Sequence, residues 1–386
     1  MRLFLAVVAG TALAGSAVAA GTPLGGETRG FVVTWFSPAH YEDGTECPQG
    51  MTAGPDIPAF LSRFDGPERA RLSKGENRNE LQKLILNRGP NGENVCENPT
   101  AVPDPGMHTI EGKVGYGLNL DGTEDGSGGA QGCAHEKFTS PSGERVDNQW
   151  YRLRGCIPVR RNDGFLPKYH NGMMRDGNNT ILIELRGLDD ARNDPQVEVG
   201  IYSGRDPVVT GPAGQILADA SLTITDEPAW RAETTGRIVD GVLTTDPVDI
   251  DLQSDNATPP GDYLLKSGRL RLTLQADGRA KGLMAGYQPL DHLWGVQAPV
   301  NRNRSEGAGA GRTFHSALES TLGGPTTCPG YYYALHRLAD GFKDPKTGQC
   351  TAISAAFDVE AVPAFIIHPP SAAATKPVQA AEAPGK

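Results

Sequence analysis

The chain is poor in aromatic residues and carries no excess of positive charge. Aromatic side chains make up 6% of its 386 residues, and the formal net charge at pH 7 is -10. An acidic chain repels phosphate groups and anionic lipid headgroups. We therefore expect neither nucleic acid nor an anionic membrane surface among its partners.

Long apolar runs are also scarce. Beyond the first twenty residues, no run approaches the roughly 18 apolar residues that a membrane-spanning helix needs. At the start, Arg2 precedes an apolar stretch over 3–14, and an Ala-x-Ala pattern closes at Ala19. This order predicts a secretory signal peptide over 1–20. We expect a periplasmic or secreted protein without a membrane span.

Several motifs that identify enzymes or metal sites are missing. The sequence contains no C-x-x-C pair, which argues against a thiolate zinc site. It contains neither G-x-S-x-G nor H-E-x-x-H, so it lacks the signatures of serine hydrolases and zinc proteases. The glycine-rich stretch 307–312 lacks the Gly-Lys-Ser/Thr ending of a phosphate-binding loop.

Glycine and proline, by contrast, are abundant, with 49 and 30 residues. Such a chain turns often and forms few long helices. Stretches rich in β-branched and aromatic residues predict strands over 179–188, 196–204, 236–245 and 268–290. In the last, apolar and polar residues alternate around an Asp277-Gly278 turn, which predicts an antiparallel hairpin. We predict a mostly β protein, an antiparallel β-sandwich of the jelly-roll or lectin-like kind, with short helical, disulfide-tied flanking segments.

Composition divides the chain into five parts. They are the signal peptide (1–20), an N-terminal flanking segment with short helices (21–105), the β-sandwich domain (106–300), a C-terminal flanking segment packed on the sandwich (301–368) and a disordered tail (369–386). The tail is rich in alanine and proline and has almost no residues that form a core, which favours disorder.

Six cysteines, an even number in a chain expected to be exported, predict disulfide bonds. Six cysteines allow about 15 pairings, and spacing does not choose among them. The simplest scheme closes each bond within one part of the chain, giving Cys47–Cys96, Cys133–Cys156 and Cys328–Cys350.

An acidic loop within residues 118–156 is a candidate calcium site. Calcium prefers carboxylate and amide oxygens, and separate loops can supply them. The stretch from Asp121 begins like an EF-hand loop, but Gly132 stands where the bidentate glutamate belongs, so an EF-hand is excluded. The predicted cofactor is Ca²⁺, and its predicted ligands are Asp121, Glu124, Asp125, Asp147 and Asn148.

Two other interpretations of this loop stay open. His135, Glu136 and Asp147 combine an imidazole with carboxylates, the groups used in general acid–base catalysis and glycoside hydrolysis. On a strand, however, the neighbours His135 and Glu136 would point to opposite faces. Alternatively, the loop is a disulfide-tied turn followed by a strand over 146–156 that enters the core through Trp150.

These features predict an exported, non-catalytic binding or structural protein stabilised by calcium. Its expected ligand is a glycan or another exported protein. The alternative is a secreted glycan-active enzyme that uses His135, Glu136 or Asp147. The two hypotheses predict different mutant effects. If the protein is an enzyme, His135→Ala should abolish turnover. If it is stabilised by calcium, replacing Asp121 and Asp125 by alanine should lower its melting temperature.

Overall fold

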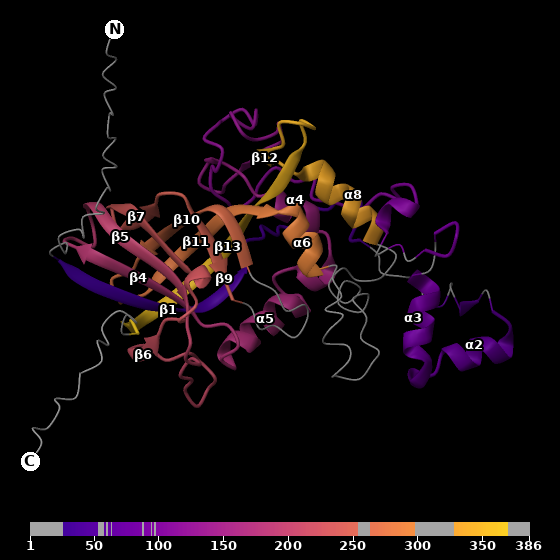
Figure 1. The fold of residues 1–386 in the computed structure, drawn as a ribbon, viewed down its shortest axis with the longest axis horizontal. Coiled ribbons are helices and arrows are strands. Elements are labelled where there is room, and N and C mark those ends of the chain that lie inside the picture. Colours follow the sequence, from indigo (N-terminus) through magenta and orange to yellow (C-terminus); the bar gives the residue numbers. More distant parts are fainter. Residues whose placement is uncertain are drawn as a thin grey trace, which may run out of the picture.

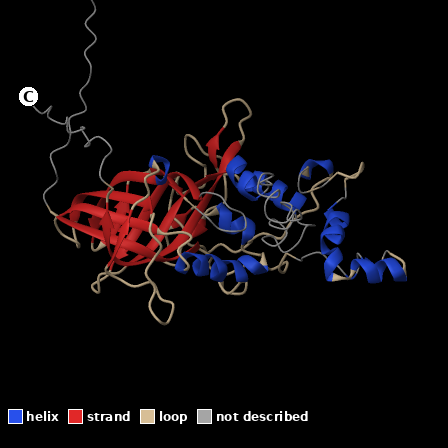
Figure 2. Ribbon diagram, turned by 60° about the horizontal axis from the view of Figure 1, so that its bottom comes forward, coloured by secondary structure: helices blue, strands red, loops and turns tan. Residues whose placement is uncertain are grey.

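The computed structural model shows a mostly β protein. It describes residues 26–52, 58, 61–62, 64–86, 89–93, 95, 98–253, 263–297 and 328–369. The expected signal peptide lies outside these residues, as does all but the first residue of the expected tail. Figures 1 and 2 show the strands gathered in one body, with α4, α5, α6 and α8 at one end of it.

Eight antiparallel strands form a closed barrel. Going round it, they are β1 (Glu27–Pro38), β4 (Ile181–Leu188), β5 (Asp194–Ser203), β7 (Arg231–Val239), β8 (Val242–Thr245), β10 (Tyr263–Leu274), β11 (Ala280–Pro289) and β13 (Cys350–Ile367). The circle closes because β13 also pairs with β1, with Gly30 opposite Ala364 and Pro38 opposite Phe357.

The predicted β-sandwich is therefore wrong. A sandwich consists of two sheets, whereas here a single sheet bends until its first and last strands pair. The alternation of apolar and polar residues fits both architectures, because each buries one face of every strand. The pairing that decides between them joins residues as distant in sequence as Gly30 and Ala364.

Shorter elements surround the barrel. Further strands are β6 (Ala220–Thr223), β9 (Val248–Leu252) and β12 (Gly341–Lys343), which extend the main sheet, and β2 (Phe138–Thr139) and β3 (Arg145–Val146), which form a separate hairpin. The α-helices are α2 (Gly66–Leu72), α3 (Arg78–Leu86), α4 (Gln149–Arg154), α5 (Phe165–Arg175), α6 (Leu290–Gln297) and α8 (Cys328–Leu338). The 3₁₀ helices are η1 (Gly75–Asn77), η2 (Pro99–Ala101), η3 (Pro158–Arg160) and η4 (Pro228–Trp230). None of the described helices is long and apolar enough to cross a membrane.

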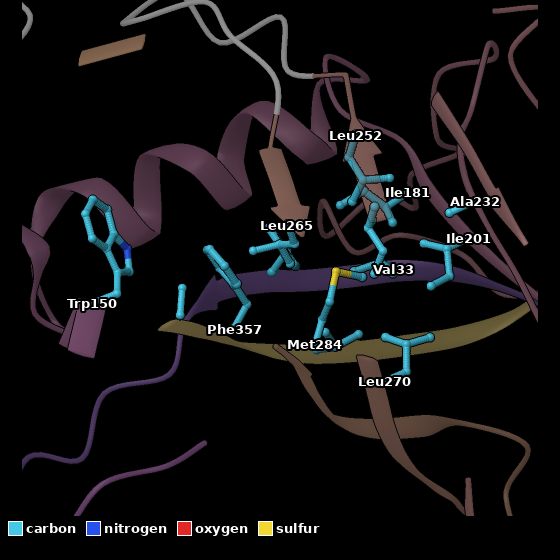
Figure 3. Packing of buried hydrophobic residues seen from close by; sticks show 14 of the residues in the cluster. Val33, Trp150, Ile181, Ile201, Ala232, Leu252, Leu265, Leu270, Met284 and Phe357 are labelled. Atoms are coloured by element: carbon cyan, nitrogen blue, oxygen red, sulfur yellow. The ribbon is translucent and has the colours of Figure 1, made fainter. Parts of the chain in front are cut away.

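The barrel interior holds the main apolar core. On β1, Phe31 and Val33 belong to this core, while Val32 between them packs on the outer face with Leu182 of β4. Figure 3 shows Val33 and Met284 meeting from different strands, and both are fully buried. The period of two along each strand thus separates the interior from the outer surface.

The local strand predictions are confirmed. The stretches 179–188 and 196–204 contain most of β4 and β5, and 236–245 covers the β7–β8 turn. β10 and β11 form the predicted hairpin, and Gly278 in its turn has φ +85°, a conformation that favours glycine. β1 and β13 lie in the two expected flanking segments, so all three central parts of the chain supply barrel strands.

The alternative prediction of a strand over 146–156 is wrong, because this stretch forms α4. The side chain of Asn148 accepts a hydrogen bond from the backbone N–H of Tyr151 and so caps the helix. Every residue of α4 is buried. α4 has only six residues, too few to show a helical period, and Tyr151 to Arg154 alternate apolar and charged side chains as a strand does.

The disulfide pattern also differs from the prediction. Cys47 bonds to Cys156 and Cys133 bonds to Cys350, across separations of 109 and 217 residues. Cys328 is disulfide-bonded as well, and Cys96 lies outside the described residues. The sequential pairs that these bonds exclude are Cys47–Cys96, Cys133–Cys156 and Cys328–Cys350. The prediction fails because the fold brings distant segments together.

Residues 110–147, which we call the loop layer, cover part of the barrel wall. Leu118 and Leu120 pack with Tyr287 of β11 and Ala356 of β13 in a cluster on the outside of the barrel. The Cys133–Cys350 bond ties the same layer to the start of β13. The loop layer is thus a fixed part of the fold.

Replacing Cys133 and Cys350 together by alanine should lower the free energy of unfolding by about 4–5 kcal/mol, because it frees a loop of 217 residues in the unfolded chain. Urea denaturation measures this loss. Non-reducing peptide mapping of the wild-type protein should link Cys47 to Cys156. Recovery of a peptide that joins Cys133 to Cys156 would contradict the described pairing.

Candidate functional site

Five charged side chains lie buried between the loop layer and the barrel. We call Asp121, His135, Lys137, Asp147 and Asp340 the buried charge cluster; their side chains are 3%, 5%, 0%, 0% and 0% exposed. The loop layer folds back on itself here, because the backbone N–H of Asp147 donates to the Leu118 carbonyl oxygen at 2.9 Å. That bridge brings Asp121 beside Asp147.

The Asp147 carboxylate is the centre of the cluster. Its Oδ1 atom accepts hydrogen bonds from His135 Nε2 at 2.8 Å and lies 2.9 Å from Lys137 Nζ. Its Oδ2 atom accepts from the backbone N–H groups of Leu120 at 2.7 Å and Asp121 at 3.4 Å. A buried charge is tolerated only when it is paired and hydrogen-bonded, and both oxygens of Asp147 meet that condition.

Lys137 supplies an internal cation. Its ammonium donates to Asp121 Oδ1 at 2.6 Å and to Asn119 Oδ1 at 2.9 Å, in addition to its contact with Asp147. An ammonium has three N–H donors, and three oxygens surround this one. Lys137 therefore neutralises the two aspartates from a position between them.

His135 is held from both sides of its ring. Nδ1 lies 2.9 Å from the Cys133 carbonyl oxygen, while Nε2 contacts Asp147, so both ring nitrogens face acceptors and the ring carries two protons. The backbone N–H of His135 donates to Gly126 O at 2.9 Å. Gly126 has φ +75°, and a Cβ there would lie 2.2 Å from the His135 carbonyl oxygen, so glycine is required for this approach.

Asp340 joins the cluster to the barrel. Its Oδ1 atom accepts a hydrogen bond from the backbone N–H of Ser354 in β13 at 2.7 Å, and its Oδ2 atom lies 3.7 Å from His135 Nε2. Within the described part of the chain, Oδ2 has no hydrogen-bond partner. The Asp340 carbonyl oxygen accepts from the N–H of Cys133 at 2.9 Å, which places the Cys133–Cys350 bond beside the cluster.

The protonation states follow from burial and charge. Burial raises the pKa of Asp340 to about 7, against the opposing charge of His135. Burial alone would lower the pKa of His135, but the hydrogen bond to Asp147 and the charge of Asp340 raise it to about 9. Burial opposes ionisation of Asp147, yet hydrogen bonds from His135 and Lys137 hold its pKa below the ordinary value. At neutral pH, Asp147 is a carboxylate between two cations.

Asp121, His135 and Asp147 can hold a metal ion, because one ligand atom from each lies within 4.8 Å of the others. Calcium prefers oxygen ligands, whereas an imidazole among the donors favours zinc or another transition metal. The Lys137 ammonium lies between the two carboxylates, so a metal ion that binds both must displace its charge.

The other predicted calcium ligands lie elsewhere. Glu124 and Asp125 are on exposed turns of the loop layer, and the Asn148 side chain is committed to capping α4. Three of the five predicted ligands are therefore absent from the cluster.

The predicted catalytic residues are also divided. His135 and Asp147 are in contact, but Glu136 faces the surface, where it pairs with Lys113 and is 50% exposed. This arrangement agrees with neighbours that point to opposite faces. The His135–Asp147 pair resembles a catalytic dyad in distance but is enclosed by protein.

Sequence reasoning missed Lys137 and Asp340. A local signal existed for Lys137, since residues two apart on an extended stretch share a face, and His135 was already a candidate. No local signal exists for Asp340, which reaches the cluster from the segment before β13.

A cleft of about 810 Å³ lies at the end of the barrel away from α4, α5, α6 and α8. We call it the end cleft. It is formed by the start of β1, the β4–β5, β7–β8 and β10–β11 turns and the end of β13, and its lining includes Arg29, Asp190, Arg192, Asp240, Leu274 and Phe365. Phe365 is 62% exposed. The end cleft therefore combines an aromatic surface with carboxylates and guanidinium groups.

The raised pKa of His135 predicts a loss of stability in alkali. Unfolded His135 releases its proton near its ordinary pKa of 6.5, whereas folded His135 keeps it until about 9. Its contribution is complete below pH 6.5 and disappears as the pH rises through 9. The loss should amount to about 3–3.5 kcal/mol and is measured by urea denaturation across this range.

A matched control is His108→Asn, because His108 is partly exposed and lies outside the cluster. The His108 variant should keep the alkaline slope, and His135→Asn should lose it. An unchanged slope in the His135 variant would show that His135 is not the group responsible.

No protein-family model, curated protein or solved structure matches the chain.

Proposed function

We propose that the chain is an exported binding protein without catalytic chemistry. In this proposal the buried charge cluster is a structural centre and the end cleft binds the ligand. The observation that carries it is the enclosure of the cluster, since the side chains of His135 and Asp147 are 5% and 0% exposed. A general base must come within hydrogen-bond distance of the proton that it removes. Neither group can reach a substrate while the loop layer is in place.

The arrangement of carboxylates supports the same conclusion. A glycoside hydrolase places two carboxyl groups on either side of an accessible sugar. Here Glu136 lies on the surface and Asp147 in the interior, and Lys137 and His135 neutralise Asp147. This favours a structural role over the glycan-active enzyme.

Export is supported by the disulfides and by the expected signal peptide. Cys47–Cys156 and Cys133–Cys350 are bonds of a kind that persists in oxidising compartments such as the periplasm or the extracellular space.

The ligand class that best fits the end cleft is a glycan. The volume of the end cleft, about 810 Å³, lies within the range of small-molecule sites, roughly 300–1,000 Å³. The exposed ring of Phe365 offers an apolar face for a sugar, and Asp190, Asp240 and Arg192 offer hydrogen-bond partners for hydroxyl groups.

Phe365→Ala should lower affinity for a bound oligosaccharide about tenfold, a loss of about 1.4 kcal/mol, because it removes the aromatic face of the end cleft. A glycan array selects the oligosaccharide, and isothermal titration measures the affinity of each variant.

The matched control is Phe165→Ala. Phe165 is 62% exposed, as Phe365 is, but belongs to α5 at the opposite end of the barrel. Its variant should bind as the wild type does. An equal loss in both variants, or no oligosaccharide bound by the wild type, would overturn the assignment of the end cleft.

We further propose that the Lys137 ammonium occupies the position that a metal ion would take in the cluster. It contacts Asp121 and Asp147, the two carboxylates that the predicted calcium site shares with the structure. Calcium would need six to eight oxygens and the displacement of Lys137. Zinc would accept His135 as a ligand but would meet the same ammonium.

Lys137→Met should destabilise the protein by about 3–5 kcal/mol, because it leaves buried carboxylates without their cation. The vacated position should then admit a divalent ion, so Ca²⁺ or Zn²⁺ should restore part of the melting temperature in this variant and not in the wild type. Thermal melts in EDTA, with and without each ion, measure both effects.

Lys113→Met is the control, since Lys113 forms an exposed pair with Glu136 that should contribute less than about 1 kcal/mol. The proposal would be wrong if EDTA lowered the melting temperature of the wild type and elemental analysis found a bound metal. The cluster would then hold a resident metal ion.

A further inference from the structure

Helix α4 carries two buried arginines with different surroundings. Arg152 and Arg154 are 6% and 5% exposed. The Arg152 guanidinium donates to Gln149 Oε1 at 3.1 Å and to the Ile110 carbonyl oxygen at 3.0 Å, and it lies 4.1 Å from the centre of the Phe138 ring. Arg152 therefore has the partners that a buried cation requires.

Arg154 lacks such partners. Its Nε atom is fully buried and has no hydrogen-bond partner in the part of the chain that the structure describes. The guanidinium carbon lies 4.6 Å from the centre of the Trp150 ring. A cation–π contact stabilises a charge by about 0.5–2 kcal/mol, whereas removing an ion from water costs several kcal/mol. The contact with Trp150 leaves most of that cost uncompensated.

The groups around Arg154 offer donors and positive charge. The indole Nε1 of Trp150 is buried and also has no hydrogen-bond partner in the described ranges. Burial, and then the charge of Arg160 in η3, holds the pKa of Arg154 well below its usual value. Burial and the charges of Arg160 and Arg154 lower the pKa of His170 in α5 to about 4. The chain thus places donors and cations together here.

We propose that Arg154 and the Trp150 N–H form a buried binding site for a small oxyanion. A guanidinium presents a planar fork of N–H donors that matches two oxygens of a carboxylate, sulfate or phosphate group. An anion would supply the missing charge and accept the free hydrogen bonds. The shared chemistry is the oxyanion, whether it is a free ion or the acidic group of a larger ligand.

This site is separate from the end cleft and from the buried charge cluster. α4 and α5 lie at the helical end of the barrel, opposite the end cleft (Figure 1). Figure 3 shows Trp150 at the edge of the apolar core, away from Val33 and Met284. The test of the oxyanion site is therefore independent of the test for glycan binding.

The test compares Arg154→Met with Arg152→Met in the oxidised, signal-free protein. Thermal melts are recorded in chloride and in phosphate, sulfate or acetate at equal ionic strength. At least one oxyanion should raise the wild-type melting temperature by several degrees over chloride. Arg152→Met should melt lower in every buffer but keep this rise, and Arg154→Met should lose it. In chloride, Arg154→Met should be at least as stable as the wild type, because an unpaired buried charge is gone.

An oxyanion that co-purifies is detected by denaturing the protein and analysing the released ions by chromatography. Release from the wild type and not from Arg154→Met supports the site. If Arg154→Met does not fold, Arg154→Lys replaces it, since lysine keeps the charge but not the planar fork of N–H donors. The apparent affinity of this variant for the oxyanion should be at least tenfold lower than that of the wild type. Equal responses in wild type and Arg154 variants, or neither a rise nor a released ion in the wild type, would overturn the proposal.

Discussion

The need to neutralise the buried carboxylate of Asp147 fixes much of the structure outside the barrel. Its two oxygens accept from His135, Lys137 and two backbone N–H groups, so the loop layer cannot shift without leaving a charge unpaired. The next residue, Asn148, caps α4. One turn of the chain therefore positions both the buried charge cluster and the helix that carries Arg154.

This arrangement separates stabilising chemistry from accessible surface. Charges that hold the fold together lie along the barrel wall, under the loop layer, where the Cys133–Cys350 bond reinforces them. The helices cover one end of the barrel, and Phe365 and the charged groups of the end cleft lie at the other. In the proposed binding function, a ligand can meet the end cleft without disturbing the ion pairs that stabilise the loop layer.

How far the sequence predicts this structure depends on the range of each interaction. β4, β5 and the β10–β11 hairpin could be predicted, because a period of two and an Asp-Gly turn are local signals. The closed barrel could not, because it rests on a pairing between the first and last strands. α4 was missed because six residues are too few to show a helical period.

The candidate site shows the same limit. Asp121 and Asp147 could be identified as a pair of loop carboxylates, and His135 was a candidate for another role. Lys137 was not identified, because a lysine is seldom buried unless it is paired. Its partners, Asp121 and Asp147, come close to it only when the loop layer folds back. Asp340 could not be identified either, because it comes from the segment between α8 and β12, about 200 residues after the loop layer.

The pairing of β1 with β13 also sets an order of events for a chain that is made from its N-terminus. Among the strands that the structure describes, β1 is synthesised first and β13 last, so the barrel stays an open sheet with two unpaired edges until β13 has been made. Contacts between such distant segments are slow to form. The Cys133–Cys350 bond must wait as well, because Cys350 begins β13. Closure of the barrel is therefore a late and collective event in the folding of this protein.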